Sequence, residues 1–134
     1  MALDGRIQHV VKELASQGIW LCQYGNANGE ASLVRAEEDA TPIDGANVAR
    51  AMDDIRSVFD PSGQWELGSY TGKHILESWR RRHRSGNPYI SNGDFIVAMI
   101  LSGYSYKFRE DPESVVGPSN VNAAFKATCM KKIH

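Results

Sequence analysis

The run from Phe95 to Leu101 constrains the fold of this chain most strongly, because its uninterrupted apolar residues would surround most of a helix. Ser91 precedes the run as an N-cap with Asp94 at the third helical position, and Gly103 follows it as a typical C-terminal stop. We therefore expect a central, buried helix between Ser91 and Gly103. The run is far shorter than the ~20 residues that span a bilayer, so it favours a core helix over a membrane segment.

Apolar residues at helical spacing predict further helices on both sides of this central one. Asp4 is the expected N-cap of the first, and Thr41 followed by Pro42 is the expected start of the second. An amphipathic segment that begins at Ser119 predicts the last helix. The four segments are 4–17, 41–59, 69–84 and the stretch that follows Ser119.

Two runs rich in β-forming residues, 19–24 and 30–35, predict a hairpin near the N-terminus. Between them lies a turn signal at Asn28–Gly29, two residues that tolerate positive φ. Residues 105–118 show no periodicity and are expected to be irregular. The expected fold class is therefore mainly α, of the α+β kind, with about five helices and one N-terminal hairpin.

The length of 134 residues is that of one compact domain, 1–134. We expect three parts: a helix plus hairpin at 1–36, a helical core at 41–104, and an irregular segment with a C-terminal helix at 105–134. Cys22 and Cys129 are too isolated for a metal or redox pair. No secretory signal opens the sequence, so we expect a cytoplasmic protein. We also expect no cofactor, no metal and no membrane partner.

Charge is unevenly distributed along a chain whose net charge is -1. Residues 1–67 carry five basic and eleven acidic residues, whereas residues 68–134 carry ten basic and five acidic residues. This asymmetry indicates either a basic binding face or two halves that pack together and partly neutralise each other. Within the second predicted helix, Arg50 and Asp54 are expected to form a pair on the polar side.

A basic cluster near the end of the third predicted helix carries the functional hypothesis. Helical spacing brings its cations toward one arc, where guanidinium groups could bind phosphates or an acidic protein surface. The expected ligand-binding residues are Lys73, Arg80, Arg81 and Arg84, with Tyr70, His74, Arg82 and Tyr89 as accessory residues.

A second interpretation of this cluster is structural. Cations at a helix C-terminus complement the helix dipole, and Glu77 can pair with Arg80 or Arg81. The sequence pI of about 6.4 also counts against a dedicated nucleic-acid binder. Trp79 and His83 lie on the apolar side of the predicted helix and are expected to pack there.

Motifs for catalysis are weak in this sequence. Gly68–His74 resembles a phosphate loop, but it is one residue short and has His74 where a hydroxyl would hold Mg²⁺. The four histidines have no metal-ligand spacing, and we predict no catalytic residue and no metal ligand. An enzyme would be sought around Tyr70, Lys73 and His74, where polar groups could converge on a pocket.

Three blocks within residues 69–104 resemble small uncharacterised proteins of phages, viruses and other mobile genomes. The blocks are Ser69–His74, Tyr89–Ile96 and Gly103–Tyr104, and the region spans about 36 of the 134 residues. In the resembling proteins the first block reads Ser-Tyr-Gly-Leu-Lys-His, from which Thr71 and Gly72 depart. The resemblance implies a small accessory protein, in the host cytoplasm if the protein is viral, and no activity.

The sequence thus favours a small, non-enzymatic binding protein that docks phosphates or an acidic partner surface through a basic helix. The expected partner is a nucleic acid or an acidic protein. The alternative is a protein-interaction or assembly component, such as a virion or host-factor-binding subunit. It would appear as a homo-oligomer, or as a large apolar patch that the two-sided hydrophobicity of the hairpin leaves exposed. An enzyme of unknown class is the third hypothesis.

Overall fold

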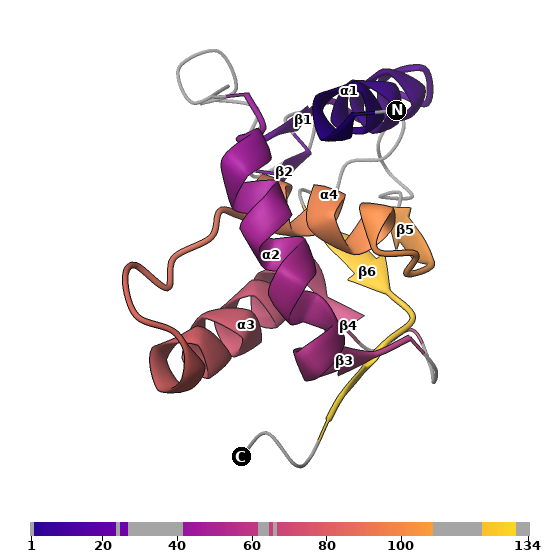
Figure 1. Cartoon of the computed structure of the whole chain (residues 1–134). Helices are drawn as coiled ribbons and strands as arrows, with labels where there is room; N and C mark the ends of the chain where they lie inside the picture. The colour runs from indigo at the N-terminus through magenta and orange to yellow at the C-terminus, as the bar shows by residue number, and fades with distance from the viewer. Residues whose placement is uncertain are drawn as a thin grey trace, which may run out of the picture.

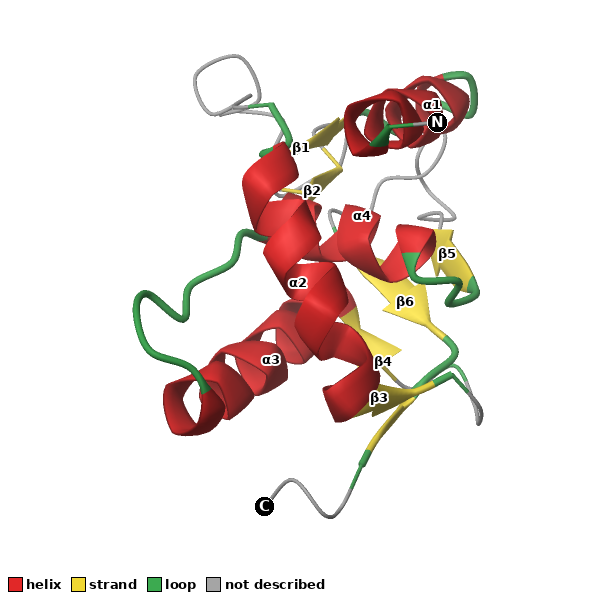
Figure 2. Cartoon of the chain, viewed as in Figure 1, coloured by secondary structure: helices red, strands yellow, loops and turns green. Residues whose placement is uncertain are grey.

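A computed structural model describes residues 2–23, 25–26, 42–61, 65, 67–108 and 122–130 (Figures 1 and 2). Its helices are α1 (Leu3–Ala15), α2 (Gly45–Val58), α3 (Ser69–His83) and α4 (Asn92–Leu101). Its short strands are β1 (Leu21–Cys22), β2 (Gly25–Asn26), β3 (Phe59–Asp60), β4 (Leu67–Gly68), β5 (Tyr106–Phe108), β6 (Ala123–Phe125) and β7 (Thr128–Cys129). The fold is therefore mixed α and β, which agrees with the expected class but not with all of its elements.

The central helix predicted from the apolar run is α4, and it packs against α1, α2 and α3 (Figure 1). Every residue from Asn92 to Met99 is buried. The hydroxyl of Ser91 accepts a 3.1 Å hydrogen bond from the Asp94 amide, as expected for an N-cap. At the other end, Gly103 has a φ of 91° and the Tyr104 amide donates to the Met99 carbonyl at 3.1 Å. Both predicted ends of this helix are confirmed.

The first turn of α4 touches the N-terminal segment through its backbone. The amide of Gly93 donates a 2.9 Å hydrogen bond to the carbonyl of Gln23. A Cβ atom at Gly93 would lie only 1.7 Å from the carbonyl oxygen of Cys22, so no other residue fits without moving one of the two backbones. Gly93 therefore allows β1 to rest directly on the core helix.

Two helix starts differ from those predicted. The N-cap position of α1 is Ala2, which makes no side-chain hydrogen bond, and Asp4 lies inside the helix. The N-cap of α2 is Asp44, whose carboxylate accepts from the Ala46 and Asn47 amides. Thr41, the predicted cap, lies outside the described residues. Asp44 is favoured because its own amide donates to the carboxylate of Asp94 at 2.8 Å, which ties this cap to α4.

The predicted N-terminal hairpin is not the pairing observed. Strand β1 pairs with β2 in antiparallel register, Leu21 opposite Asn26 and Cys22 opposite Gly25. The chain therefore reverses earlier than expected, inside the first predicted strand and its turn. The second predicted strand, 30–35, lies outside the described residues.

The predicted C-terminal helix is wrong over residues 123–129, which contain two strands instead. Strand β6 lies between β4 and β5 in an antiparallel sheet, and β7 pairs with β3. In β6, Ala123 and Phe125 are buried and Ala124 between them is partly exposed, an alternation typical of a strand with one face on the core. Strand β5 likewise replaces part of the irregular segment 105–118. Residues 109–121, which include Ser119, lie outside the described residues.

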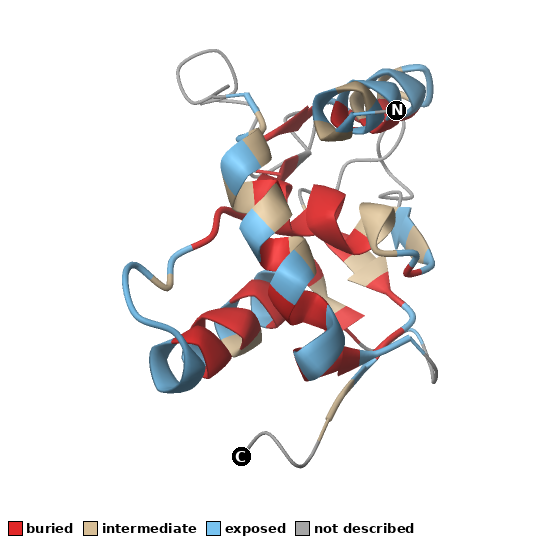
Figure 3. Cartoon of the chain, in the orientation of Figure 1, coloured by how far each residue is buried: buried red, intermediate tan, exposed pale blue. Residues whose placement is uncertain are grey.

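The hydrophobic core lies between the helices and the β4–β6–β5 sheet (Figure 3). The outer end of α3 and the loop that follows it are exposed, and Figure 1 shows this loop running back toward the start of α4. In the part of the chain that the structure describes, none of the helices has the length and apolarity needed to cross a bilayer.

Candidate functional site

The cations of α3 do not form the single exposed arc that the sequence predicts. Lys73 is buried, with only 9% of its side chain exposed. Its ammonium group lies 3.3 Å from Glu77 Oε2 and donates to the Ile90 carbonyl at 3.0 Å. The expectation that Lys73 faces solvent is therefore wrong, because the chain that follows α3 folds back over this side of the helix.

Glu77 is the centre of this internal contact. Its Oε2 also accepts from the Ile90 amide at 3.1 Å, and its Oε1 lies 2.9 Å from His74 Nδ1. Burial raises the pKa of the Glu77 carboxyl, but the Ile90 amide, Lys73 and His74 together outweigh burial, so the net pKa is lowered. An ionised Glu77 thus helps to hold Ile90, and with it the end of the α3–α4 loop, against α3.

Arg80 and Arg84 share one carboxylate on α2. Arg80 Nε donates to Asp54 Oδ2 at 3.2 Å, and Arg84 donates to Asp54 Oδ1 from Nε at 3.1 Å and from Nη2 at 2.9 Å. Asp54 is buried on the α3 side of α2, so the predicted pairing of Asp54 with Arg50 on a polar side is wrong. The expectation that Arg80 is exposed is also wrong, since its side chain is only 6% exposed.

This shared carboxylate leaves positive charge at the site. Two guanidinium groups face one carboxylate, so one unit of positive charge has no acidic partner in this group of three. Arg80 Nη2 is buried without a hydrogen-bond acceptor among the described residues. Leaving a buried donor unpaired costs about 1–3 kcal/mol, and more when the group is charged. An additional anion in the adjoining space would balance the excess positive charge of the group.

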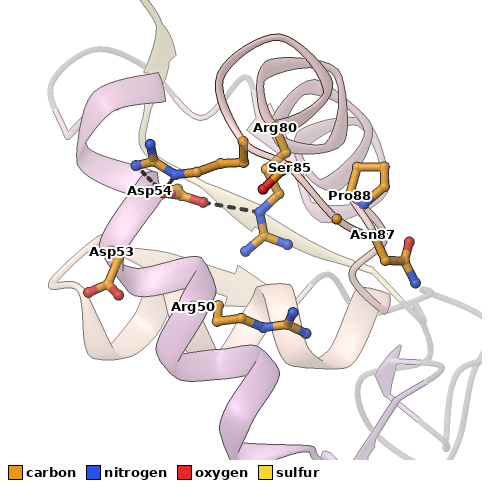
Figure 4. Close-up of a pocket in the computed structure, with 9 residues that line it drawn as sticks. Arg50, Asp53, Asp54, Arg80, Ser85, Asn87 and Pro88 are labelled. Carbon is orange, nitrogen blue, oxygen red and sulfur yellow. Dashed lines mark hydrogen bonds and ion pairs between the residues drawn. The ribbon is translucent and has the colours of Figure 1, made fainter.

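A pocket of about 220 Å³ opens beside this group, between α2 and the loop that follows α3 (Figure 4). In Figure 4 the side chain of Arg50 extends toward the side of the pocket where Asn87 lies, whereas the carboxylate of Asp53 extends away from it. With Arg84, whose side chain is 54% exposed, three arginines and two aspartates contribute to the pocket lining. The lining is completed by residues 85–88: Ser85, Gly86, Asn87 and Pro88.

Arg81 and Arg82, the remaining cations of α3, are exposed near its C-terminus. Trp79 is buried, as predicted, but His83 is exposed and stacks on the Trp79 ring at 4.6 Å between centroids. The guanidinium of Arg84 lies 4.9 Å from the same ring. Arg81, Arg82 and Arg84 are therefore three exposed arginines at the outer end of α3, and Arg84 also lines the pocket.

Three predicted accessory residues, Tyr70, His74 and Tyr89, form exposed rings along α3 and its loop. The two tyrosines are 57% and 53% exposed, and the side chain of His74 is 50% exposed. Tyr70 and His74 meet edge to face at 4.6 Å between ring centroids, and Lys73 Nζ lies 4.6 Å from the Tyr89 ring centre. We call Tyr70, His74 and Tyr89 the ring surface.

Sequence reasoning missed the part of the site that α2 contributes. Asp54 is 26 residues from Arg80 and 30 from Arg84, and local spacing carries no signal for such a pair. The sequence placed Arg50 on the polar side of a helix but did not indicate that it would line a pocket. The break at Ser85–Pro88 predicted a turn, but nothing in that turn indicated that it would line a pocket.

Comparisons of the chain with protein-family models, with curated proteins and with solved structures gave no match. Across the described ranges, no group of three or more His, Cys, Asp and Glu side chains is arranged to hold a metal ion.

Proposed function

We propose that this protein binds a ligand that carries a phosphate group, and that the phosphate enters the pocket between α2 and the α3–α4 loop. The observation that carries the proposal is the Arg80–Asp54–Arg84 group, in which two guanidiniums share one buried carboxylate beside a pocket. Arg50 adds a third guanidinium from α2. A compact anion supplies the negative charge that this arrangement lacks.

The size of the pocket favours a single small anion. Pockets for drug-sized ligands measure about 300–1,000 Å³, and this one, at about 220 Å³, is smaller. Guanidinium groups bind tetrahedral phosphate oxygens through paired N–H donors, and such charge-assisted hydrogen bonds are about twice as strong as neutral ones. The pocket thus has the size and the donors for a phosphate group.

The same geometry argues against the broad basic helix expected from the sequence. Lys73 and Arg80 are used inside the protein, so a flat acidic partner would reach only Arg81, Arg82 and part of Arg84 on α3. The expected ligand group is therefore still a phosphate, but its expected site is the pocket and not the surface of the helix.

Inorganic phosphate titrated into ¹⁵N-labelled protein tests the proposal directly. At constant ionic strength against chloride, the backbone amides of Ser85, Gly86 and Asn87 should shift and saturate, because they line the pocket. Shifts spread evenly over exposed basic residues, without saturation at this loop, would contradict the proposal.

Arg50→Gln should weaken phosphate binding about tenfold, since a hydrogen bond to a charged group is worth about 1.5–3 kcal/mol. Arg50 is exposed and donates a hydrogen bond to the neutral side chain of Asn47, so the variant should fold normally. Lys12→Gln is the matched control: it removes one exposed cation from α1, outside the pocket. Equal loss of affinity in both variants would indicate only a general charge effect and would overturn the proposal.

A further inference from the structure

The ring surface is held in place by a continuous chain of contacts. Lys73 Nζ lies 4.6 Å from the Tyr89 ring centre and 3.3 Å from Glu77 Oε2. Glu77 Oε1 lies 2.9 Å from His74 Nδ1, and the ring centroids of His74 and Tyr70 are 4.6 Å apart. The centre of this chain is the buried Lys73–Glu77 pair, which also binds both backbone groups of Ile90. The exposed rings are thus positioned before any ligand arrives, which lowers the entropy cost of binding.

The ring surface and the pocket belong to one stretch of chain. Residues 85–88 line the pocket, and Tyr89 is the next residue along the loop. A ligand with a phosphate in the pocket and a planar group beside it would therefore reach Tyr89. Tyr and His rings stack on planar heteroaromatic groups, which is how proteins bind the unpaired bases of nucleic acids.

Charge on this side of the molecule suits a polyanion. The pocket and α3 together carry six cations and three carboxylates, although the whole chain has a net charge of -1. The cations are Lys73, Arg50, Arg80, Arg81, Arg82 and Arg84, and the carboxylates are Asp53, Asp54 and Glu77. Arg81 follows His74 and Tyr70 along nearly the same line of α3, since eleven residues at 100° each return to within about 20°.

We propose that the ligand is single-stranded nucleic acid, with a phosphate in the pocket and bases stacked on Tyr70, His74 and Tyr89. This inference rests on the proposed phosphate site. Three rings on two segments offer more stacking surface than one base can cover, so a strand fits better than a mononucleotide. A duplex fits poorly, because its base faces are already stacked inside the helix.

Fluorescence anisotropy with a labelled oligothymidylate of about 12 nucleotides, a length typical of such sites, tests this inference. Tyr70→Ala and Tyr89→Ala should each weaken binding about fivefold or more, and Tyr70→Phe and Tyr89→Phe should retain the wild-type affinity, because the ring stacks and not the hydroxyl. Trp20→Ala is the control, since Trp20 is equally exposed but lies between α1 and β1. Thermal melting of each variant confirms that it is folded.

Competition experiments separate the failure of this inference from failure of the phosphate site. Unlabelled strand should compete far better than thymidine monophosphate or a duplex of the same length. If inorganic phosphate binds at the loop but the strand does not, or if the alanine variants bind the strand normally, the inference is overturned and the phosphate site stands. Equal affinity for strand, duplex and mononucleotide would also overturn it. If neither phosphate nor strand binds, both proposals fail.

Discussion

At the scale of single residues, the buried charged side chains at the site make internal polar contacts. Glu77 shows this most clearly: one carboxylate contacts Lys73, His74 and the amide of Ile90. Lys73 and His74, adjacent in the sequence, thus have two different roles. Lys73 is part of the internal structure, and His74 connects that structure to the exposed ring surface.

Acid should weaken the Glu77 contacts in a way that a pH series can detect. The folded pKa of Glu77 lies below its ordinary value of 4.5, so its ionised form stabilises the fold above that pH. This stabilisation is lost as the pH falls through the lower folded pKa. The difference in free energy of unfolding between wild type and Glu77→Gln, measured with urea at pH 7, 4.5 and 3, should therefore shrink toward acid.

Asp94 provides the opposite control. Burial raises its pKa above the ordinary value of 3.8, although the Asp44 amide, Ser91 and Asn47 act against this. The protonated form of Asp94 therefore stabilises the fold, and this stabilisation is fully present below pH 3.8. It is lost as the pH rises through the higher folded pKa. Wild type should gain stability relative to Asp94→Asn as the pH falls, and parallel trends in the two variants would contradict the assignment.

At the scale of elements, α2 and α3 are joined by a buried polar contact rather than by apolar packing alone. Asp54 sits on the inner side of α2, and it is reached by Arg80 from the last turn of α3 and by Arg84 from the residue that follows the helix. This contact fixes the end of α3 and hence the first residue of the loop that lines the pocket. The geometry of the pocket therefore depends on a helix pair that lies behind it.

Asp54→Asn should destabilise the protein by about 3–5 kcal/mol, because it leaves Arg80 buried without a carboxylate. Asp53→Asn, the same change at the exposed neighbouring residue, should alter stability by about 0.5 kcal/mol or less. The double variant Asp54→Leu/Arg80→Met should recover much of the loss, since it removes both buried charges. Urea denaturation of the four proteins measures this, and similar values for the two Asn variants would refute the role of Asp54.

The sequence was informative where the determinants of structure are local. The ends of α4 follow from Ser91, Asp94 and Gly103, and these signals lie within a few residues of what they specify. The segment around Phe125 was misassigned because its apolar residues fit a helix and a strand equally well. This segment forms a strand because it pairs with β4 and β5, whose residues are distant in the sequence. The same applies to Asp54, whose partners are 26 and 30 residues away.

At the scale of the whole molecule, the two oppositely charged halves of the sequence meet at the α2–α3 contact. Asp54 comes from the acidic half, and Arg80 and Arg84 come from the basic half. The interpretation that the halves pack together and partly neutralise each other is therefore supported at this contact, whereas the basic binding face stays a prediction.

The N-terminal segment is joined to the core at Gly93, so a change there should affect the whole fold. Gly93→Ala should lower the free energy of unfolding by about 3 kcal/mol or more, because its Cβ would overlap the Cys22 carbonyl. Gly68→Ala is the control: no atom lies within 4 Å of its Cβ and its φ of -74° suits any residue. Urea midpoints that shift equally in both variants would show that the close approach is unimportant.

The loop between α3 and α4 is fastened at both ends, by Arg84 to Asp54 and by Ile90 to Lys73 and Glu77. Residues 85–88 span the interval between these anchors, and none of Ser85, Gly86 or Asn87 belongs to the hydrophobic core. Ser85 is therefore the position where a new side chain costs folding least, because Gly86 has a φ of 92° that favours glycine and Asn87 accepts a 3.0 Å hydrogen bond from the Tyr89 amide. Under the proposed function, a change at Ser85 would alter the pocket lining while the Asp54–Arg80 contact behind it stays in place.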